Sequence, residues 1–559
     1  MRISFNASPA LHGVAALALV GVLAAGAPAV PAQPLVPSIR LPQLGDSGQI
    51  GLTEERRLGD RIARSLYRDP DYLDDPTLLA YVQSIWQPLL KTAQQRGDVS
   101  PELAERFAWE LMLARDKTVN AFALPGGYLG VHLGLIASVA NADELASVLA
   151  HELSHVSQRH IARLMTQQSQ QAPWMVAAMI LGALAANAAK NVDVASAAIA
   201  GGQAVALQSQ LNFSRDMERE ADRVGFGVMT EAGFAGQGFV GMFEKLQQAS
   251  RLNDDGAFPY LRSHPLTTER VADMRARLPD AQPTADKDEN RPQLHAMMAA
   301  RARVLAERQP ERWRALLQSG DLAPLPLQDA ATLGLRYGAV LAAAQLRDAA
   351  SAEQQLRHLL NALPAAAQTA PQQAAAQAVR QLALEAMVML QMPQMAGLQR
   401  STLLQEAWAL PERPAWLLAA RSALQPGSAS SALRSATEHL QTWTTQNTRD
   451  AQAWQLLGQL YLAQQRPASA ARAEAEARFA QFDPQGALDR LKAAQTMAHK
   501  EGADHVELSI LDARTRYAEQ WVRQQWQEEQ QGNPSRLAMG GNGTTDAGPS
   551  PRPLSSAPR

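Results

Sequence analysis

The chain has 559 residues, a formal net charge of −2 and no cysteine. Its length predicts at least two domains, and its small net charge excludes the global basic field of a nucleic-acid-binding protein. The absence of cysteine excludes disulfides and cysteine-ligated zinc, so a zinc site in this chain must use histidine and carboxylate ligands.

The N-terminus has the features of a secretory signal peptide. Arg2 precedes the apolar run Val14–Ala25, and small residues continue to Ala32. We expect cleavage after Ala32, with Ala29 as the alternative, so residues 1–32 are the predicted signal peptide. The short apolar core argues against an uncleaved membrane anchor, and no cysteine follows that would carry a lipid. The mature protein is therefore expected in the periplasm.

Two helices and a small sheet are predicted next. Residues 33–50 are expected to run extended over the surface. Apolar residues at helical spacing predict one helix from Thr53 and another over Pro76–Ala93. Alternating apolar and β-branched residues then predict three strands, at 109–114, 119–124 and 128–132.

The predicted hairpin carries a candidate substrate-binding strand. A Pro-Gly-Gly turn at 125–127 joins the second and third strands. Zinc proteases often hold their substrate as an added strand against a sheet edge. The candidate edge residues are Asn120, Ala121, Phe122 and Ala123. An ordinary structural hairpin is the alternative.

The zinc-protease pattern consists of His151 and His155, four residues apart, with Glu152 just after the first. Apolar residues recur at helical spacing over 143–164, and no Gly or Pro interrupts them. On a helix the two histidines project from one face toward one metal, while Glu152 is rotated by about 100° and flanks it. A pair of ordinary surface histidines is the alternative. His160 falls nearly opposite His151 and is interpreted as a non-ligand.

Two apolar stretches follow, at 172–189 and 194–206. They predict a helical hairpin whose first arm is short for a membrane-spanning helix. Burial against another domain is the favoured interpretation. Contact of residues 172–189 with a membrane surface or a hydrophobic client is the alternative.

A carboxylate that would complete the zinc site is found in the segment 212–225. Two histidines leave a zinc site one protein ligand short. Glu218 and Asp222 are four residues apart and share one helix face, so one can bind metal while the other supports the site from behind. Glu220 points elsewhere. A solvated acidic helix is the alternative.

His264 is a further candidate, on a loop fixed by Pro265. One interpretation is a fourth zinc ligand that displaces the water and blocks the enzyme in a resting state. Another is a catalytic group that stabilises the developing oxyanion. A helix-capping or packing histidine is the alternative. Arg262 and Arg270 are weaker oxyanion candidates.

These motifs resemble the gluzincin family of the CAAX-prenyl endopeptidases and the bacterial heat-shock protease HtpX. The resemblance rests on His151-Glu-x-x-His155, on Glu218-x-x-Ala-Asp222 and on the segment Asn120–Gly127. Integral members of the family carry transmembrane segments in this region. The predicted signal peptide and the short apolar hairpin indicate a soluble, periplasmic branch instead.

The resemblance implies one zinc ion per subunit and assigns roles to individual residues. The implied metal ligands are His151, His155 and Glu218. Glu152 is implied as the catalytic base, and Asp222 as the support of a ligand histidine.

The C-terminal half predicts helical repeats. Residues 278–292 have the composition of a linker. The sequence Trp454-x-x-Leu-Gly-x-x-Tyr461, with Ala470 beyond it, matches a tetratricopeptide repeat. We expect about four helical pairs with a concave surface for peptides or proteins. A plain helical domain is the alternative. The tail 532–559 is rich in Gly, Pro and Ser and is expected to be disordered.

The predicted fold class is mainly α. An α+β zincin metallopeptidase domain with a small β-sheet is expected at 33–285, followed by an all-α tetratricopeptide-repeat solenoid at 286–531. This arrangement resembles a family of periplasmic proteases that assist the assembly of outer-membrane β-barrels. It implies a zinc endopeptidase and chaperone that degrades misfolded or stalled outer-membrane proteins and contacts the outer-membrane β-barrel assembly machinery through its repeats.

Two other functions are compatible with the sequence. One is a mainly non-proteolytic chaperone or adaptor of the outer-membrane assembly machinery, with a normally closed zinc site. The other is an intramembrane protease, which would need spanning helices. No nucleic-acid partner is expected.

Overall fold

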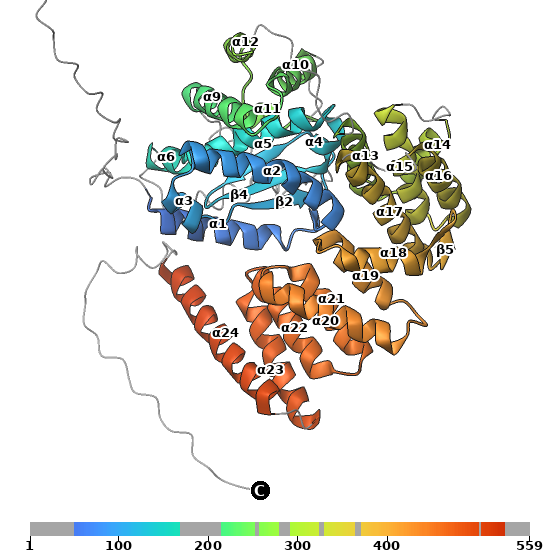
Figure 1. The fold of residues 1–559 in the computed structure, drawn as a ribbon. Coiled ribbons are helices and arrows are strands. Elements are labelled where there is room, and N and C mark those ends of the chain that lie inside the picture. Colours follow the sequence, from blue (N-terminus) through green and yellow to red (C-terminus); the bar gives the residue numbers. More distant parts are fainter. Residues whose placement is uncertain are drawn as a thin grey trace, which may run out of the picture. The chain divides into compact units, whose positions relative to one another are not determined.

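A computed structural model describes residues 50–167, 214–251, 257–278, 291–322, 329–363, 370–501 and 505–531. The predicted signal peptide, the apolar stretches within 172–206, the predicted domain boundary at 285/286 and the tail from 532 lie outside the described residues. The elements of the described parts are mostly helices, with one four-stranded sheet and one two-stranded hairpin (Figure 1), which confirms the predicted mainly α class. Among the described residues, no helix combines the length and apolarity that crossing a membrane requires.

A four-stranded sheet lies in the N-terminal half. Its spatial order is β1-β2-β4-β3, so β3 is an edge strand. The pair β2–β4 is parallel, while β1–β2 and β3–β4 are antiparallel. The antiparallel pairing of β3 with β4 confirms the predicted hairpin. The strands are β1 (Tyr72–Leu73), β2 (Glu110–Ala114), β3 (Ala121–Leu124) and β4 (Tyr128–His132).

Two predicted strands begin later than expected, and the two-residue strand β1 was not predicted. Trp109 has a φ of 50°, a left-handed conformation that cannot extend β2. Val119 lies before β3 because its backbone N–H donates to the Ala257 carbonyl at 2.8 Å, outside the hairpin. The strand β1 is too short to show a period-2 pattern.

Helices cover both faces of the sheet (Figure 1). Leu111, Leu113 and Val131 point to the main core, which they share with helices α2 and α5. Met112 and Tyr128 point to the opposite face and pack with α1. This alternation follows from the period of two along a strand. The N-terminal helices are α1 (Leu52–Leu66), α2 (Pro76–Arg96), α3 (Pro101–Arg106), α4 (Leu133–Ser138), α5 (Ala142–Ser157) and α6 (His160–Gln167).

The predicted zinc helix is shorter than expected. Asn141 caps α5 by accepting a hydrogen bond from the Glu144 backbone N–H at 2.9 Å. The helix ends at Ser157 rather than continuing to 164, because Arg159 adopts a left-handed φ of 53°. The Arg159 guanidinium donates to the buried Glu55 carboxylate at 2.9 Å, which holds the break in place.

A second group of helices lies after residue 213, and its first two members pack against α5. They are α9 (Arg215–Glu231), α10 (Gln237–Arg251), α11 (Tyr260–Ser263) and α12 (Thr268–Ala276). Ser214 caps α9 by accepting from the Met217 backbone N–H. Gly225 lets α9 approach α5 closely, because a Cβ at this position would lie 3.0 Å from the Ala150 carbonyl oxygen. This approach brings Glu218 beside α5, which carries His151 and His155.

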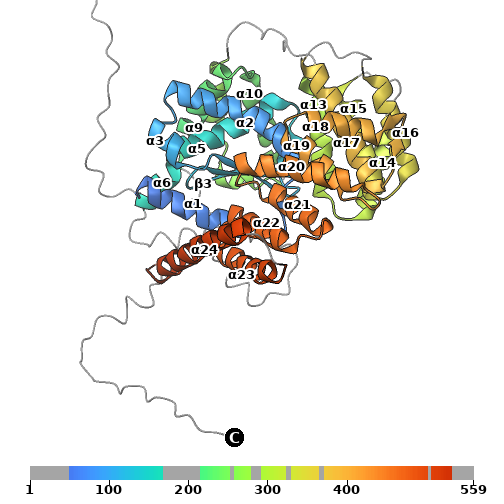
Figure 2. The same cartoon turned by 60° about the horizontal axis from the view of Figure 1, so that its bottom comes forward.

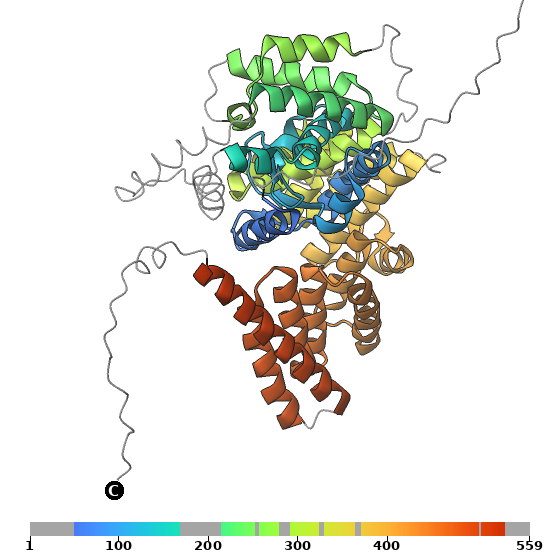
Figure 3. The same cartoon turned by 90° about the vertical axis from the view of Figure 1, so that its left-hand side faces the viewer.

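The C-terminal half consists of helices with one short hairpin. Successive helices pack side by side, as α21 to α24 do (Figures 2 and 3). The helices are α13 (Arg291–Ala306), α14 (Pro310–Asp321), α15 (Ala330–Gln345), α16 (Ala349–Ala362), α17 (Ala370–Leu390), α18 (Arg400–Ala409), α19 (Arg413–Ala423), α20 (Ser430–Gln446), α21 (Ala451–Ala463), α22 (Pro467–Ala480), α23 (Pro484–Glu501) and α24 (His505–Gln531). The hairpin is β5 (Gln394–Met395) with β6 (Leu398–Gln399).

The apolar core and two arginines join the two halves. One hydrophobic cluster runs from Leu78 in α2 to Ala419 in α19. Arg301 of α13 pairs with Asp75 at the start of α2 at 2.6 Å. Arg413 of α19 pairs with Asp74 at 2.7 Å. The N-terminus of α2 is therefore fixed directly to the C-terminal helices.

Candidate metal centre

Four buried side chains converge beside α5: His151, His155, Glu218 and His264. One ligand atom from each lies within 4.8 Å of the ligand atoms of the others. Each of the four residues is at most 2% exposed. The helices α5 and α9 and the loop that follows α11 thus bring together the histidines and the carboxylate that the sequence singled out as candidate metal ligands.

Five separations between these side chains are close to those between the ligands of a tetrahedral metal site. His155 Nε2 lies 3.0 Å from His151 Nε2, and His264 Nδ1 lies 3.3 Å from His151 Nε2. Glu218 oxygens lie 3.0 to 3.5 Å from the three histidine nitrogens. Four ligands at about 2.0–2.1 Å from a tetrahedral zinc are separated from one another by roughly 3.3 Å. The donor set of three imidazoles and one carboxylate also suits zinc.

Supporting contacts fix the rings of both α5 histidines. Asp222 Oδ1 lies 3.0 Å from His151 Nδ1, on the side of the ring that faces away from the cluster. His160 Nδ1 lies 2.8 Å from His155 Nδ1, and Glu220 lies 3.1 Å from His160 Nε2. Such partners behind a metal ligand orient its ring and select its tautomer.

His160 stays outside the cluster, as interpreted from the sequence, but for a different reason. The prediction assumed one continuous helix that turns His160 away from His151. The helix instead ends at Ser157, and a new helix begins at His160. Burial lowers the pKa of His160 to about 4, against the opposing effect of the Glu220 carboxylate. A neutral His160 can therefore act as a hydrogen-bond partner of His155.

Burial and neighbouring charges shift the pKa values of the cluster in different directions. Burial disfavours charge on His151, but hydrogen bonds to Asp222 and Glu218 outweigh it and raise its pKa to about 9. Burial holds the pKa of His155 well below its usual range. Despite burial, the nearby His264 and the other two histidines lower the pKa of Glu218 well below its usual value. Metal binding would release the proton from His151, so metal affinity should fall in acid.

Glu152 lies next to His264 of the cluster. Both of its carboxylate oxygens are buried, and Oε1 is 3.4 Å from His264 Nε2. Burial raises the pKa of Glu152, although His264 and His151 oppose this effect. A carboxylate in this position can accept a proton from a group bound at the metal position.

His264 is carried by a short segment that also contacts the edge of the sheet. The Tyr260 ring stacks on the His264 ring with centroids 4.5 Å apart. The Tyr260 backbone N–H donates to the Val119 carbonyl at 3.4 Å, and the Val119 N–H donates to Ala257. The segment 257–264 therefore pairs with the chain immediately before β3.

The edge of β3 that does not pair with β4 carries the backbone groups of two predicted substrate-strand residues, of which Ala121 is buried and Ala123 is partly exposed. The His132 N–H donates to the Asn120 carbonyl at 3.0 Å, so the backbone of Asn120 faces β4. Residues along an antiparallel strand alternate in this direction. Phe122 therefore also faces β4, while Ala121 and Ala123 turn their N–H and C=O groups outward, on the side where Val119 meets Ala257.

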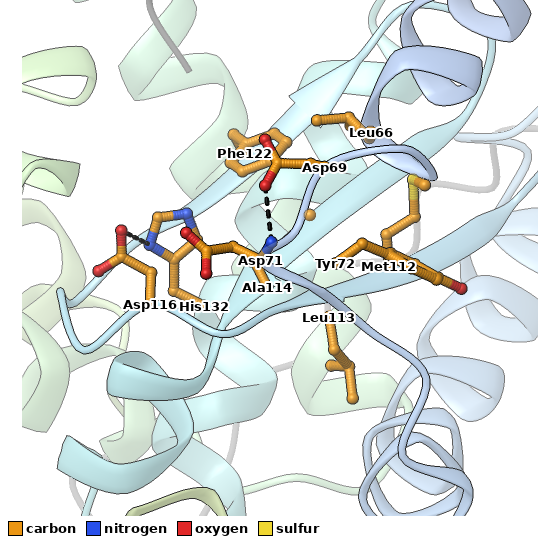
Figure 4. Close-up of a pocket in the computed structure, with 11 residues that line it drawn as sticks. Leu66, Asp69, Asp71, Tyr72, Met112, Leu113, Ala114, Asp116, Phe122 and His132 are labelled. Carbon is orange, nitrogen blue, oxygen red and sulfur yellow. Dashed lines mark hydrogen bonds and ion pairs between the residues drawn. The ribbon is translucent and has the colours of Figure 1, made fainter. Parts of the chain in front are cut away.

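A separate pocket of about 60 Å³ lies on the face of the sheet that α1 covers (Figure 4). Its lining includes Phe122, Met112 and His132, and Figure 4 shows Asp116 facing His132. The Phe122 ring lies directly against Gly130. A Cβ added at Gly130 would lie 2.1 Å from a ring atom, so the ring needs a glycine at this position. None of the four metal-cluster residues lines this pocket, so it is not part of the metal centre.

Sequence reasoning missed three residues around the cluster. Tyr260 and His160 were not assigned a role near the metal, and Arg270 was named only as an oxyanion candidate. Arg270 instead donates to the Asp222 carboxylate at 2.6 Å. The sequence contained only a weak signal for His160, which follows His155, and for Tyr260, which precedes His264. The position of His160 depends on the break at Arg159, and that of Tyr260 depends on the path of the loop. Arg262 is exposed on α11.

Comparison with known proteins agrees with this geometry. Residues 80–278 match peptidase family M48. A Vibrio cholerae protein is 35% identical over 257 residues, which cover 46% of this chain and 51% of that protein. The beta-barrel assembly-enhancing protease of Yersinia pestis is 32% identical over 277 residues, 48% of this chain and 53% of that protein. The mitochondrial metalloendopeptidase OMA1 of Saccharomyces cerevisiae is 27% identical over 207 residues, 36% of this chain and 56% of that protein.

The chain spans about half the length of these relatives. The matched region contains the α5 motif, Glu218 and His264, and it therefore coincides with the structural cluster. Residues 80–278 thus resemble a metallopeptidase domain of family M48.

Proposed function

We propose that this protein is a periplasmic zinc endopeptidase in the quality control of outer-membrane protein assembly. Its clients would be misfolded or stalled β-barrel proteins. The observation that carries the catalytic part is the close spacing of His151, His155, Glu218 and His264, with the Glu152 carboxylate beside them. The names of the bacterial relatives support the client class.

The residues of the centre can perform peptide hydrolysis. A zinc ion held by His151, His155 and Glu218 would lower the pKa of a water molecule and polarise the scissile carbonyl. Glu152 takes the proton of the attacking water and later delivers it to the leaving amine. Asp222 keeps the His151 ring in place through its 3.0 Å contact. No covalent intermediate with the protein is needed.

The edge strand β3 supports the substrate side of the proposal. The outward backbone groups of Ala123, which is partly exposed, can pair with an extended segment of the substrate, as in β-strand addition, whereas Ala121 is buried. β3 also contacts α5, so a segment held at this edge would lie next to the zinc helix. Main-chain pairing places few demands on side chains, which suits unfolded clients of varied sequence.

The proposed location rests on the expected signal peptide and on the relatives. One zinc ion per subunit follows from the single cluster found among the described residues. The paired C-terminal helices offer a surface on which the outer-membrane β-barrel assembly machinery could bind, as expected for tetratricopeptide repeats. Contact of residues 172–189 with a membrane surface remains part of the proposal.

The substitution Glu152→Gln tests the endopeptidase proposal. It removes the proton acceptor while retaining size and all metal-binding side chains. We expect loss of cleavage of an unfolded polypeptide such as casein, with zinc content unchanged by elemental analysis. Glu102→Gln, an exposed carboxylate on α3, is the matched control and should cleave like the wild type. Cleavage retained by Glu152→Gln would contradict the proposal.

A second candidate function is favoured by the closed state of the site. With His264 in the cluster, four protein ligands are present, as in structural zinc sites, whereas catalytic sites keep one position for water. This favours a chaperone or adaptor that cleaves rarely. His264→Ala separates the roles of this residue. Faster proteolysis would indicate a blocking ligand, and lost proteolysis would indicate a catalytic group.

A further inference from the structure

Arg270 on α12 is the charged group that joins the parts of the metal centre. It is 4% exposed although it carries a full positive charge. Its Nε and Nη2 donate to the two oxygens of Asp222 at 2.6 and 2.8 Å. Its Nη1 lies 2.8 Å from Glu218 Oε2 and also donates to the Pro265 carbonyl at 2.8 Å. One guanidinium therefore contacts a metal-ligand carboxylate, the support of His151 and the loop of His264.

These contacts balance the charge behind the metal. Asp222 and Glu218 are two carboxylates on one face of α9, each 1% exposed. Two buried carboxylates on neighbouring turns of one helix repel each other, and burial of each charge carries a desolvation cost. Arg270 offsets both, because its planar fork can serve two carboxylates at once, which a lysine ammonium cannot.

The same contacts favour a supporting role over the oxyanion role considered from the sequence. Nε, Nη1 and Nη2 are each committed to a carboxylate or a carbonyl. The flat side of the guanidinium lies over the Phe243 ring, with its carbon 5.2 Å from the ring centroid. The contacts of Arg270 thus go to the two carboxylates, the Pro265 carbonyl and the Phe243 ring.

The contact with Pro265 extends the network to the segment that carries His264. Pro265 directly follows His264, and the His264 backbone N–H donates to the Tyr260 carbonyl at 2.9 Å. A shift of Arg270 toward or away from the carboxylates must therefore change its bond to the loop. Metal binding changes the charge that these carboxylates present to Arg270.

We propose that Arg270 is a positioning residue that couples metal binding to the placement of the His264 segment. The proposal rests on the zinc site of the proposed function, but it does not require that the protein cleaves peptides. Such coupling is reciprocal. A bound metal therefore favours the position of segment 257–264 that brings His264 into the cluster, and that position in turn favours metal binding.

Zinc affinity measured by chelator competition on the full chain tests the first half of the proposal. We expect Arg270→Met to weaken zinc binding by about 10- to 100-fold, the usual cost of losing a partner behind a metal ligand. The zinc affinity of Arg270→Lys should lie between those of the wild type and Arg270→Met, because lysine keeps the positive charge but lacks the planar fork of donors. Arg275→Met is the matched control, since Arg275 is an exposed arginine on α12 that pairs with Glu244. It should bind zinc like the wild type.

A second variant keeps the test meaningful if Arg270→Met folds poorly. Adding Asp222→Asn removes one of the two carboxylates that Arg270 offsets. We expect the double variant to be better folded by circular dichroism than Arg270→Met, and its loss of zinc affinity to be smaller than the product of the two single losses. If Arg270 only filled space against Phe243, the added substitution would give no rescue, which would overturn the charge argument.

Amide hydrogen exchange of residues 260–264 tests the second half. In wild-type protein, zinc should slow exchange at the His264 amide, and in Arg270→Lys this zinc effect should be reduced at least severalfold. His264→Ala should also weaken zinc binding less in the Arg270→Lys background than alone. Equal zinc effects on exchange in wild type and variant, or additive losses of affinity, would overturn the coupling. Loss of proteolysis in Glu152→Gln bears on the proposed function and leaves these measurements unaffected.

Discussion

Replacing Arg301 should destabilise the whole chain, because this side chain joins its two halves. The Arg301 guanidinium donates two hydrogen bonds to Asp75, at 2.6 and 2.8 Å, and two to Glu385, at 2.7 and 3.0 Å. Asp75 is also the N-cap of α2 and accepts from the Leu78 backbone N–H at 2.8 Å. One substitution, Arg301→Met, therefore leaves two carboxylates facing each other without a cation.

The expected loss can be worked out from burial. Arg301 is 1% exposed and Asp75 8%, so neither charge is well solvated in the folded state. Removing one partner of a buried ion pair costs about 3–5 kcal/mol. The side chain of Glu385 retains 18% exposure, so water can compensate part of its loss and the lower end of that range is expected. By contrast, Arg380→Met breaks an exposed pair with Glu406 and should cost less than about 1 kcal/mol.

Urea unfolding measures these differences. Circular dichroism and tryptophan fluorescence should be followed together, because a chain of this size need not unfold in one step. Adding Asp75→Asn and Glu385→Gln to Arg301→Met should recover stability, since the unpaired charges disappear while the cap is retained. A loss for Arg301→Met no larger than that for Arg380→Met would refute the reasoning.

The pH dependence of the same pair has a defined sign. Burial raises the pKa of Asp75, but Arg301 and the Leu78 backbone N–H outweigh it and the folded pKa is lowered. A carboxyl with a lowered folded pKa adds stability that is complete above its unfolded pKa of about 3.9 and is lost as the pH falls through the folded value. The stability difference between wild type and Asp75→Asn should therefore shrink in acid.

Two further predictions concern helix contacts. Gly225→Val should lower the free energy of unfolding by about 1–3 kcal/mol by overpacking α9 against Ala150, and it should weaken zinc binding. Gly51→Val is the control, because the space around Gly51 is open, and it should have neither effect. Equal zinc affinity in the two variants would contradict this. His295 accepts a hydrogen bond from the Tyr81 hydroxyl at 2.6 Å, and burial lowers its pKa. Stability should fall as the pH drops below about 6.5, and His295→Gln should reduce this slope in urea titrations at pH 5 and 7, an unchanged slope being the contrary result.

Local sequence patterns were sufficient for the elements that carry the ligands. The i, i+4 spacing of His151 and His155 defines a common helix face whatever the rest of the chain does. Glu218 and Asp222 share a face for the same reason. The hairpin of β3 and β4 also follows from local information, because a glycine turn joins two apolar runs of opposite direction.

The sequence did not give the end of the zinc helix. No Gly or Pro marks the break at Arg159, whose left-handed backbone is held by the distant Glu55 and the Ile50 carbonyl. Helical periodicity cannot report such a contact, because the partner lies more than a hundred residues away in the chain. The place of His160 beside His155 depends on this break.

Only the tertiary structure decided which role is open to each remaining polar residue. Arg270 and His264 were candidates for the same oxyanion role, and the sequence offered no distance between them and α5. Packing of α9, α11 and α12 places His264 among the candidate ligands and turns Arg270 toward Asp222 and Glu218. Short-range spacing thus determined the ligand pairs within each helix. The assembly of those pairs into one centre depended on contacts between helices far apart in sequence, which periodicity does not encode.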